Sequence, residues 1–143
     1  MGEYRHALDD KGRLFIPARF REELGAPSVV AKGLDGCLFL FPRASWQRLQ
    51  DDLAHLPLTR SDARAFMRFL LAGAAEVEPD RQGRIGVPTP LREHAALVRE
   101  AVVVGVGDRV EVWAQDRWEA YSREAAQAFE RIAEELASPG VGA

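Results

Sequence analysis

The sequence predicts an α+β fold made of two tandem units, and two observations support this. A nine-residue pattern occurs twice, as DDKGRLFIP from residue 9 and as DRQGRIGVP from residue 80, so that aspartate, glycine, arginine and proline recur in register. Segments with apolar residues at alternate positions, typical of half-buried strands, are interspersed with segments whose apolar residues recur at helical spacing. The repeat therefore predicts duplicated units, each with the order strand, strand, helix, strand, strand, helix.

The first half of each unit is predicted from the residues around the repeated turn. Alternation in EYRHAL (residues 3–8) and AEVE (75–78) indicates the strand before each turn, and LFI and IGV indicate the strand after it. Pro17 and Pro88 end these second strands because proline has no N–H to donate to a sheet. Helices are expected next, in ARFREELG closed by Gly25, and in TPLREHAAL opened by Thr89 and Pro90.

The second half of each unit is predicted to be a hairpin and a helix. The hairpins are SVVAKGLDGCLFLF, turning at Asp35-Gly36, and AVVVGVGDRVEVW, turning at Gly107-Asp108. A helix containing a tryptophan follows each hairpin. Between the copies, PLTRSDARAFMRFLLAGA indicates another helix, with Thr59 or Ser61 as its N-cap. The expected organisation is a first unit over 3–46, a helical connection over 47–73, a second unit over 74–117, and a C-terminal helix and tail over 118–143.

The apolar surface of the chain is larger than one chain of this size is expected to cover. Each unit is small for an independent core, so the two units should pair with each other, and the segment FMRFLL should pack against further chains. The C-terminal helix carries a stripe that fits either a packed helix or a partner surface. Its residues are Trp118, Tyr121, Ala125, Phe129, Ile132 and Leu136.

Composition and charge exclude several classes of protein. No apolar run approaches the length of a membrane span, so we expect a cytoplasmic protein without a membrane partner. The formal net charge is −3 over 143 residues, but the last thirty residues hold the whole deficit, with 3 basic and 6 acidic side chains. The rest of the chain is neutral, which leaves room for a local basic surface.

No set of residues supports catalysis or metal binding. His6, His55 and His94 lie far apart and lack the short spacings of metal-binding helices, and the lone Cys37 lies in an apolar run typical of a buried side chain. Asp9 and Asp10 are neighbours in an extended segment, where side chains point to opposite faces. We therefore expect neither an enzyme nor a cofactor.

The repeated turn has a chemistry that its residue types explain. Its aspartate accepts hydrogen bonds from backbone N–H groups further into the turn, its glycine adopts positive φ, and its arginine is then held at the end of the hairpin. Such an arginine either only stabilises the turn by pairing with the aspartate, or presents its guanidinium to phosphate or guanine. The predicted turn-structuring residues are Asp9, Gly12, Asp80 and Gly83, and the candidate DNA-binding residues are Arg13, Lys11, Arg84, Arg81 and Arg5.

Beyond the turns, the segments KGRLFIPARFREEL, GLDGCLFLFP, RFLLAGAAE and VGVGDRVEVW resemble the MraZ family. This resemblance implies two AbrB-like swapped-hairpin units of β-barrel type with flanking helices. It also implies a transcriptional regulator that is associated with the nucleoid, forms a ring-like homo-oligomer and binds double-stranded DNA. Its expected targets are direct repeats upstream of the division and cell-wall gene cluster. The alternative is a non-catalytic protein-interaction module, either antitoxin-like or a scaffold.

Overall fold

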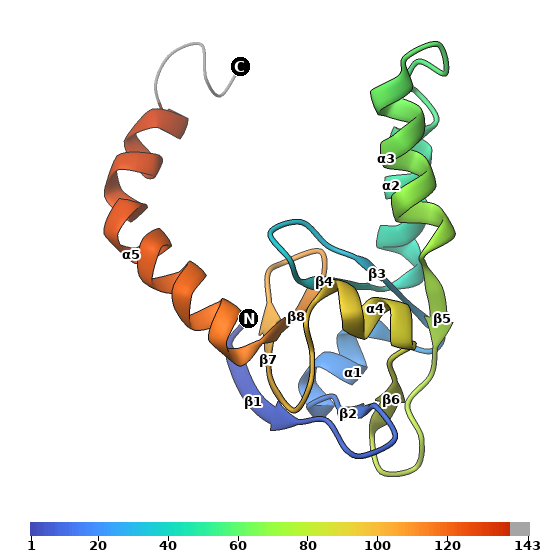
Figure 1. Ribbon diagram of the computed structural model, residues 1–143, viewed down its shortest axis with the longest axis vertical. Helices are drawn as coiled ribbons and strands as arrows, with labels where there is room; N and C mark the ends of the chain where they lie inside the picture. Colours follow the sequence, from blue (N-terminus) through green and yellow to red (C-terminus); the bar gives the residue numbers. More distant parts are fainter. Residues whose placement is uncertain (138–143) are drawn as a thin grey trace.

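The computed structural model describes residues 1–137 and confirms the α+β class (Figure 1). The last six residues of the predicted C-terminal tail, 138–143, lie outside the described residues. The strands of the described part are β1 (Glu3–Ala7), β2 (Arg13–Phe15), β3 (Ser28–Lys32), β4 (Leu38–Phe41), β5 (Ala75–Val77), β6 (Arg84–Gly86), β7 (Glu100–Gly105) and β8 (Val110–Ala114). Its helices are α1 (Ala18–Leu24), α2 (Arg43–Leu53), α3 (Ser61–Ala72), α4 (Thr89–His94) and α5 (Gln115–Ala137).

Strands from the two repeats are interleaved in the same antiparallel sheet, which has the order β1-β7-β8-β4-β3-β5. β1 of the first repeat pairs with β7 of the second, with Tyr4 opposite Val103, and β5 of the second pairs with β3 of the first. A two-stranded sheet joins β2 to β6, with Leu14 opposite Ile85. The prediction that the two units pair within the chain is therefore confirmed, and they do so by exchanging strands.

The predicted turns connect the hairpins. At the β3–β4 turn, Asp35 and Gly36 both have positive φ, 67° and 78°, a conformation that glycine adopts readily and that aspartate adopts more often than most residues. In the β7–β8 connection, Gly107 has a φ of 92°. Gly33 N–H donates to the carbonyl of Cys37 at 2.8 Å, which closes the first hairpin above its turn.

Equivalent side chains of the two repeats meet in one core. The apolar residues that follow each turn point inward, and α1 and α4 cover them, because each helix is amphipathic and begins directly after its proline. Tyr4 of β1 contacts Phe20 of α1 edge to face, with ring centroids 5.3 Å apart. The equivalent buried residues are Leu14, Ile16 and Phe20 in the first repeat and Ile85, Val87 and Leu91 in the second.

Two helical arms project from the sheet on the side away from the repeated turns (Figure 1). The first arm is the α2–α3 pair, whose helices enclose a small core of their own around Phe41, Leu53 and Leu70. The second arm is α5, which starts directly after β8. At the base of α5 the rings of Trp113 and Trp118 lie 5.4 Å apart.

One helix start differs from the prediction. Neither Thr59 nor Ser61 caps α3, since Ser61 is its first helical residue and Arg60 precedes it without a side-chain cap. Asp62 acts in the first turn instead. Its carboxylate accepts the N–H of Ala63 at 2.8 Å and two hydrogen bonds from Arg60, and negative charge is favourable at a helix N-terminus.

Candidate nucleic-acid interface

The first repeated turn holds its arginine through a network centred on Asp9. Oδ1 of Asp9 accepts the backbone N–H groups of Lys11 and Arg13, both at 2.9 Å. Oδ2 accepts the Nε–H of Arg13 at 2.6 Å. Gly12 then donates its N–H to the carbonyl of Asp9 at 3.0 Å and closes the turn. In this turn Asp9 therefore organises the backbone and holds the side chain of Arg13.

The second turn repeats this geometry with different side chains at its tip. Oδ1 of Asp80 accepts the N–H groups of Gln82 and Arg84 at 2.9 and 3.0 Å, and Oδ2 accepts Nε–H of Arg84 at 3.0 Å. In both turns the hydrogen bond from the arginine backbone N–H is the main cause that lowers the pKa of the aspartate below 3.8. Both carboxylates are therefore ionised at neutral pH.

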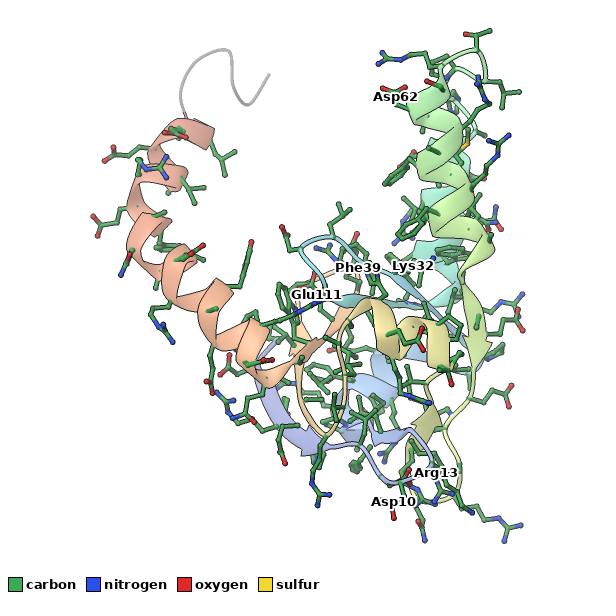
Figure 2. The ribbon with its side chains drawn as sticks, viewed as in Figure 1. Asp10, Arg13, Lys32, Phe39, Asp62 and Glu111 are labelled. Atoms are coloured by element: carbon green, nitrogen blue, oxygen red, sulfur yellow. The ribbon has the colours of Figure 1, made fainter. Side chains whose placement is uncertain are left out.

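Pairing of β2 with β6 brings the two turns side by side. Ile16 donates its N–H to the carbonyl of Gly83 at 2.9 Å, and Val87 donates to the carbonyl of Gly12 at 3.0 Å. Nη1 of Arg84 also lies 3.5 Å from Oδ2 of Asp9, which links one turn to the other. We call residues 9–13 and 80–84 together the turn pair. It lies at the end of the molecule opposite the helical arms, where Figure 2 shows Asp10 and Arg13 at the edge of the fold.

The guanidinium of Arg13 keeps most of its donors available. Asp9 engages only its Nε–H, so the two terminal nitrogens, with four N–H groups, have no hydrogen-bond partner within the described residues. A side chain oriented through Nε presents a rigid fork that matches two phosphate oxygens or the O6 and N7 edge of guanine. Arg84 is less free, because its Nη1 already lies near Asp9.

Two further candidates lie at the tips of the turn pair, and one lies elsewhere. The side chains of Lys11 and Arg81 are exposed, at turn positions two and three residues before the respective arginines. Arg5 is not at the turn pair. Its guanidinium lies 3.5 Å from Glu119 of α5 and 3.8 Å from Glu3, at the base of the α5 arm.

Two arginines that are not among the predicted DNA-binding residues also lie at the turn pair. Nη1 of Arg21 donates to the carbonyl of Ile16 at 2.6 Å, and Nη1 of Arg92 donates to that of Val87 at 2.5 Å. Each guanidinium covers a glycine of the opposite repeat: Arg92 lies over Gly12, and Arg21 lies over Gly83. The sequence carried one signal for them, since the two arginines occupy equivalent positions in the two copies. With them the turn pair has six cations and three carboxylates.

The turn glycines have the predicted conformation. φ is 73° at Gly12 and 80° at Gly83, in the left-handed region that side chains disfavour. A Cβ at either position would also contact the guanidinium above it. These two residues therefore allow both the turn and the close approach of an arginine.

The other reactive side chains have structural roles. Cys37 is fully buried, and burial raises the pKa of its thiol to about 12, so the thiolate is absent at neutral pH. His94 contacts the carbonyl of Gly33 at 3.1 Å through its Nε2.

None of the described helices is both long and apolar enough to cross a membrane.

Interleaved hairpins and paired arginine turns define a tandem swapped-hairpin protein. Its similarity to known proteins identifies the family. Residues 1–69 and 70–138 each match the family described as "MraZ protein, putative antitoxin-like". The chain is 57% identical over 136 residues to the transcriptional regulator MraZ of Heliobacterium modesticaldum, covering 95% of each protein. It is 56% identical to that of Pelotomaculum thermopropionicum over 99% of this chain and 98% of the relative, and 57% identical to that of Moorella thermoacetica over 95% of both.

The chain therefore belongs to the MraZ family. This is a family of transcriptional regulators and not of enzymes. The family resemblance predicted from the sequence motifs is confirmed.

Proposed function

We propose that this protein is a DNA-binding transcriptional regulator that contacts double-stranded DNA through the turn pair. The observation that carries the proposal is the orientation of Arg13, which Asp9 holds by Nε alone, beside a second turn of the same design. With Arg21 and Arg92 the turn pair has six cations against three carboxylates, and such a site at one end of a fold is suited to the phosphate backbone and to base edges. The relatives' name, transcriptional regulator, supports the same reading.

The finer parts of the proposal concern assembly and target. A single turn pair offers few DNA contacts, so its affinity for one site is expected to be weak. A ring-like homo-oligomer would place several turn pairs along the DNA, and avidity then raises the affinity without new contacts. The proposed targets are direct repeats upstream of the division and cell-wall gene cluster, with the protein located in the cytoplasm and associated with the nucleoid.

The roles proposed for individual residues follow from their geometry. Arg13 is the main contact because its terminal nitrogens are free. Arg84 contributes less because Asp9 partly neutralises it. Lys11 and Arg81 add exposed positive charge at the tips of the turns. Arg5 lies beside Glu119 at the base of α5, so it would contact only DNA that extends that far from the turn pair.

Fluorescence anisotropy would test the proposal, with duplex DNA from upstream of the protein's own gene and a scrambled duplex of the same composition. We expect tighter binding to the upstream duplex. Arg13→Ala should weaken that binding by a factor of about 5–150 if a guanine contact is lost, which corresponds to about 1–3 kcal/mol. If only phosphate contacts are lost, both duplexes should be affected alike and the salt slope should fall by about one per engaged subunit.

The matched control is Arg60→Ala, which removes the same charge from a residue that pairs with Asp62. Figure 2 shows Asp62 at the far tip of the α2–α3 arm. This variant should bind as the wild type does. Asp9→Ala should weaken binding less than Arg13→Ala, because the guanidinium survives and only its orientation is lost. Equal, wild-type binding by Arg13→Ala and Arg84→Ala in an intact assembly would place the DNA site on another surface. Failure of the wild type to prefer the upstream duplex would favour the protein-interaction alternative.

A further inference from the structure

The ribbon that joins the two turns of the turn pair is short. Only three residue pairs link β2 to β6, with Leu14 opposite Ile85 at the centre. Two-stranded ribbons twist more than wide sheets do, so a ribbon of this length leaves the angle between the two turns loosely defined. The turns extend beyond it as loops at the edge of the fold (Figure 1). Other contacts must therefore fix one turn relative to the other.

A closed set of contacts between the repeats holds the first turn. Val87 of the second repeat donates its N–H to the carbonyl of Gly12 at 3.0 Å. The carbonyl of Val87 in turn accepts Nη1 of Arg92, whose guanidinium lies over Gly12. Nη2 of Arg92 is anchored as well, 2.9 Å from the hydroxyl of Thr89. We call Gly12, Val87 and Arg92 the first clamp.

Equivalent residues of the exchanged repeats form the same set around the second turn. Ile16 of the first repeat donates its N–H to the carbonyl of Gly83 at 2.9 Å, and its own carbonyl accepts Nη1 of Arg21 at 2.6 Å. The guanidinium of Arg21 lies over Gly83 and 5.3 Å from the centre of the Phe15 ring. We call Gly83, Ile16 and Arg21 the second clamp. Each clamp thus joins a turn of one repeat to a helix of the other.

The two glycines leave space for the clamping arginines. Both are buried although they lie in turns at the edge of the fold, and at each one the guanidinium occupies the place of a Cβ. Arg13 directly follows Gly12, and Arg84 directly follows Gly83. Each clamp therefore presses on the residue that precedes an arginine of the proposed DNA contact.

The hydrogen bonds of the clamping arginines distinguish them from Arg13. Both terminal nitrogens of Arg92 donate to acceptors within its own repeat, and Nη1 of Arg21 does the same. The terminal nitrogens of Arg13, by contrast, have no hydrogen-bond partner within the described residues. Arg92 and Arg21 thus direct their planar forks at the protein, which suits a role in holding the turns rather than in contacting DNA.

We infer that Arg92 and Arg21 are positioning residues, each of which fixes the DNA-facing arginine of the other repeat. Arg92 positions Arg13, and Arg21 positions Arg84. This inference rests on the proposed DNA contact of the turn pair. Base contacts depend steeply on direction, whereas attraction to the phosphate backbone does not carry sequence information. The clamps therefore serve discrimination between DNA sequences and leave the number of phosphate contacts unchanged.

The first test compares Arg92→Ala with the wild type by fluorescence anisotropy on the upstream and scrambled duplexes. The ratio of the two dissociation constants should fall by at least about 5-fold, the lower end of the effect of one bidentate base contact. The salt slope on the scrambled duplex should not change, because no phosphate contact is lost. A salt slope that falls by about one per engaged subunit, with an unchanged ratio, would make Arg92 a phosphate contact and overturn the inference.

Arg92→Lys separates geometry from charge. A lysine keeps the positive charge but has no planar fork to lie over Gly12 while it bonds to Val87 and Thr89. The ratio should therefore fall as it does in Arg92→Ala, and a wild-type ratio in Arg92→Lys would overturn the inference. If circular dichroism shows that Arg92→Ala does not fold, Arg92→Lys takes its place in every comparison.

Pairs of variants test which arginine acts on which turn. Gly12→Ala displaces the guanidinium of Arg92 and keeps its charge, so the two changes together should lower the ratio by clearly less than the product of their separate effects. Gly12→Ala with Arg21→Ala is the matched control, in which the effects should multiply because Arg21 lies over the other turn. The single change Arg92→Ala should lower the ratio more than Arg21→Ala does, since Arg13 is the main contact. Multiplied effects in both pairs, or a larger loss in Arg21→Ala, would overturn the assignment.

A further control separates positioning from a general loss of stability. Gly107→Ala strains the β7–β8 connection at a φ of 92° and has no contact with the turn pair, so it should lower the stability and keep the ratio of the wild type. All variants are measured well below their Tm, where the folded fraction is close to one. An equal fall of the ratio in Gly107→Ala would show that lost stability alone explains the effect. Light scattering should show an unchanged mass for Arg92→Ala, and a changed mass would assign Arg92 to assembly instead.

Failure of this inference is distinguishable from failure of the proposed function. A wild type with no preference for the upstream duplex removes the proposed function and the positioning role with it. A wild-type preference that persists in Arg92→Ala removes the positioning role alone. Amide hydrogen exchange tests the clamp without DNA: in Arg92→Ala the N–H of Val87 should exchange faster while that of Ile16 keeps its rate. Unchanged exchange at Val87 would show that Arg92 does not hold the turn.

Discussion

Replacing Gly12 by alanine should destabilise the fold through two separate effects. A non-glycine residue at a φ of 73° costs about 1–2 kcal/mol. The new Cβ also displaces the guanidinium of Arg92, which donates to Val87 and Thr89 at 2.5 and 2.9 Å. Because Arg92 is half-exposed and water replaces part of these bonds, we assign about 1 kcal/mol to their loss. The total is about 2–3 kcal/mol, or a fall of roughly 8–12 °C in Tm at fixed protein concentration.

A double-mutant cycle separates the two effects. In an Arg92→Ala background, Gly12→Ala should cost only the backbone part, about 1–2 kcal/mol, so the coupling energy should be about 1 kcal/mol. Gly107→Ala is the matched control, since Gly107 has a φ of 92° and nothing within 4 Å of the position of its Cβ. It should also show only the backbone cost. Chemical denaturation measures each value, and an equal cost of Gly12→Ala in both backgrounds would refute the contact with Arg92.

Three other predictions can be checked with the same protein. Since the pKa values of Asp9 and Asp80 are lowered in the fold, their contribution to stability is present above about pH 3.8 and is lost as pH falls through the folded pKa values. The Asp9→Asn/Asp80→Asn variant should therefore be less stable than the wild type at pH 7. It should also lose less free energy of unfolding between pH 5 and about pH 2. Parallel plots of the free energy of unfolding against pH for the two proteins would contradict this. Cys37, with its pKa raised to about 12, should react with a thiol reagent at pH 7.5 only after unfolding, and fast labelling of the native protein would contradict its burial. Arg84→Ala should weaken DNA binding less than Arg13→Ala, as anisotropy with the upstream duplex would show. A larger loss of binding in Arg84→Ala would contradict the proposal that Arg13 is the main contact.

Local signals account for most of what the sequence predicted. Alternation, prolines at strand ends and the Asp35-Gly36 turn depend on neighbouring residues, so the strands, the helices and the repeated turn were predicted near their observed positions. The Asp9 turn was predictable for the same reason, because the hydrogen bonds that orient Lys11 and Arg13 on Asp9 lie within five residues. The predicted N-cap of α3 is wrong because Asp62, the second residue of the helix, accepts a backbone N–H of the first turn and neither Thr59 nor Ser61 does.

Contacts between the repeats were not predictable in the same way. Arg92 over Gly12, and Arg21 over Gly83, depend on strand exchange that brings distant residues together. In sequence, Arg21 resembles any surface arginine beside glutamates on a helix. The position of Arg5 also depends on α5, whose direction is set only when β8 joins the sheet.

Strand exchange has a consequence for the synthesis of the chain. β1 pairs with β7, with Glu3 opposite Val104, so the first strand cannot pair until about a hundred further residues have been synthesised. Until then the apolar faces of the first repeat have no complete sheet to join, and folding is late and dominated by distant contacts. A fragment ending near residue 69 would not be half of a folded protein. It would be a chain with unpaired edges, able to find the missing strands only in another molecule. The covalent link between the repeats turns that concentration-dependent encounter into a unimolecular step.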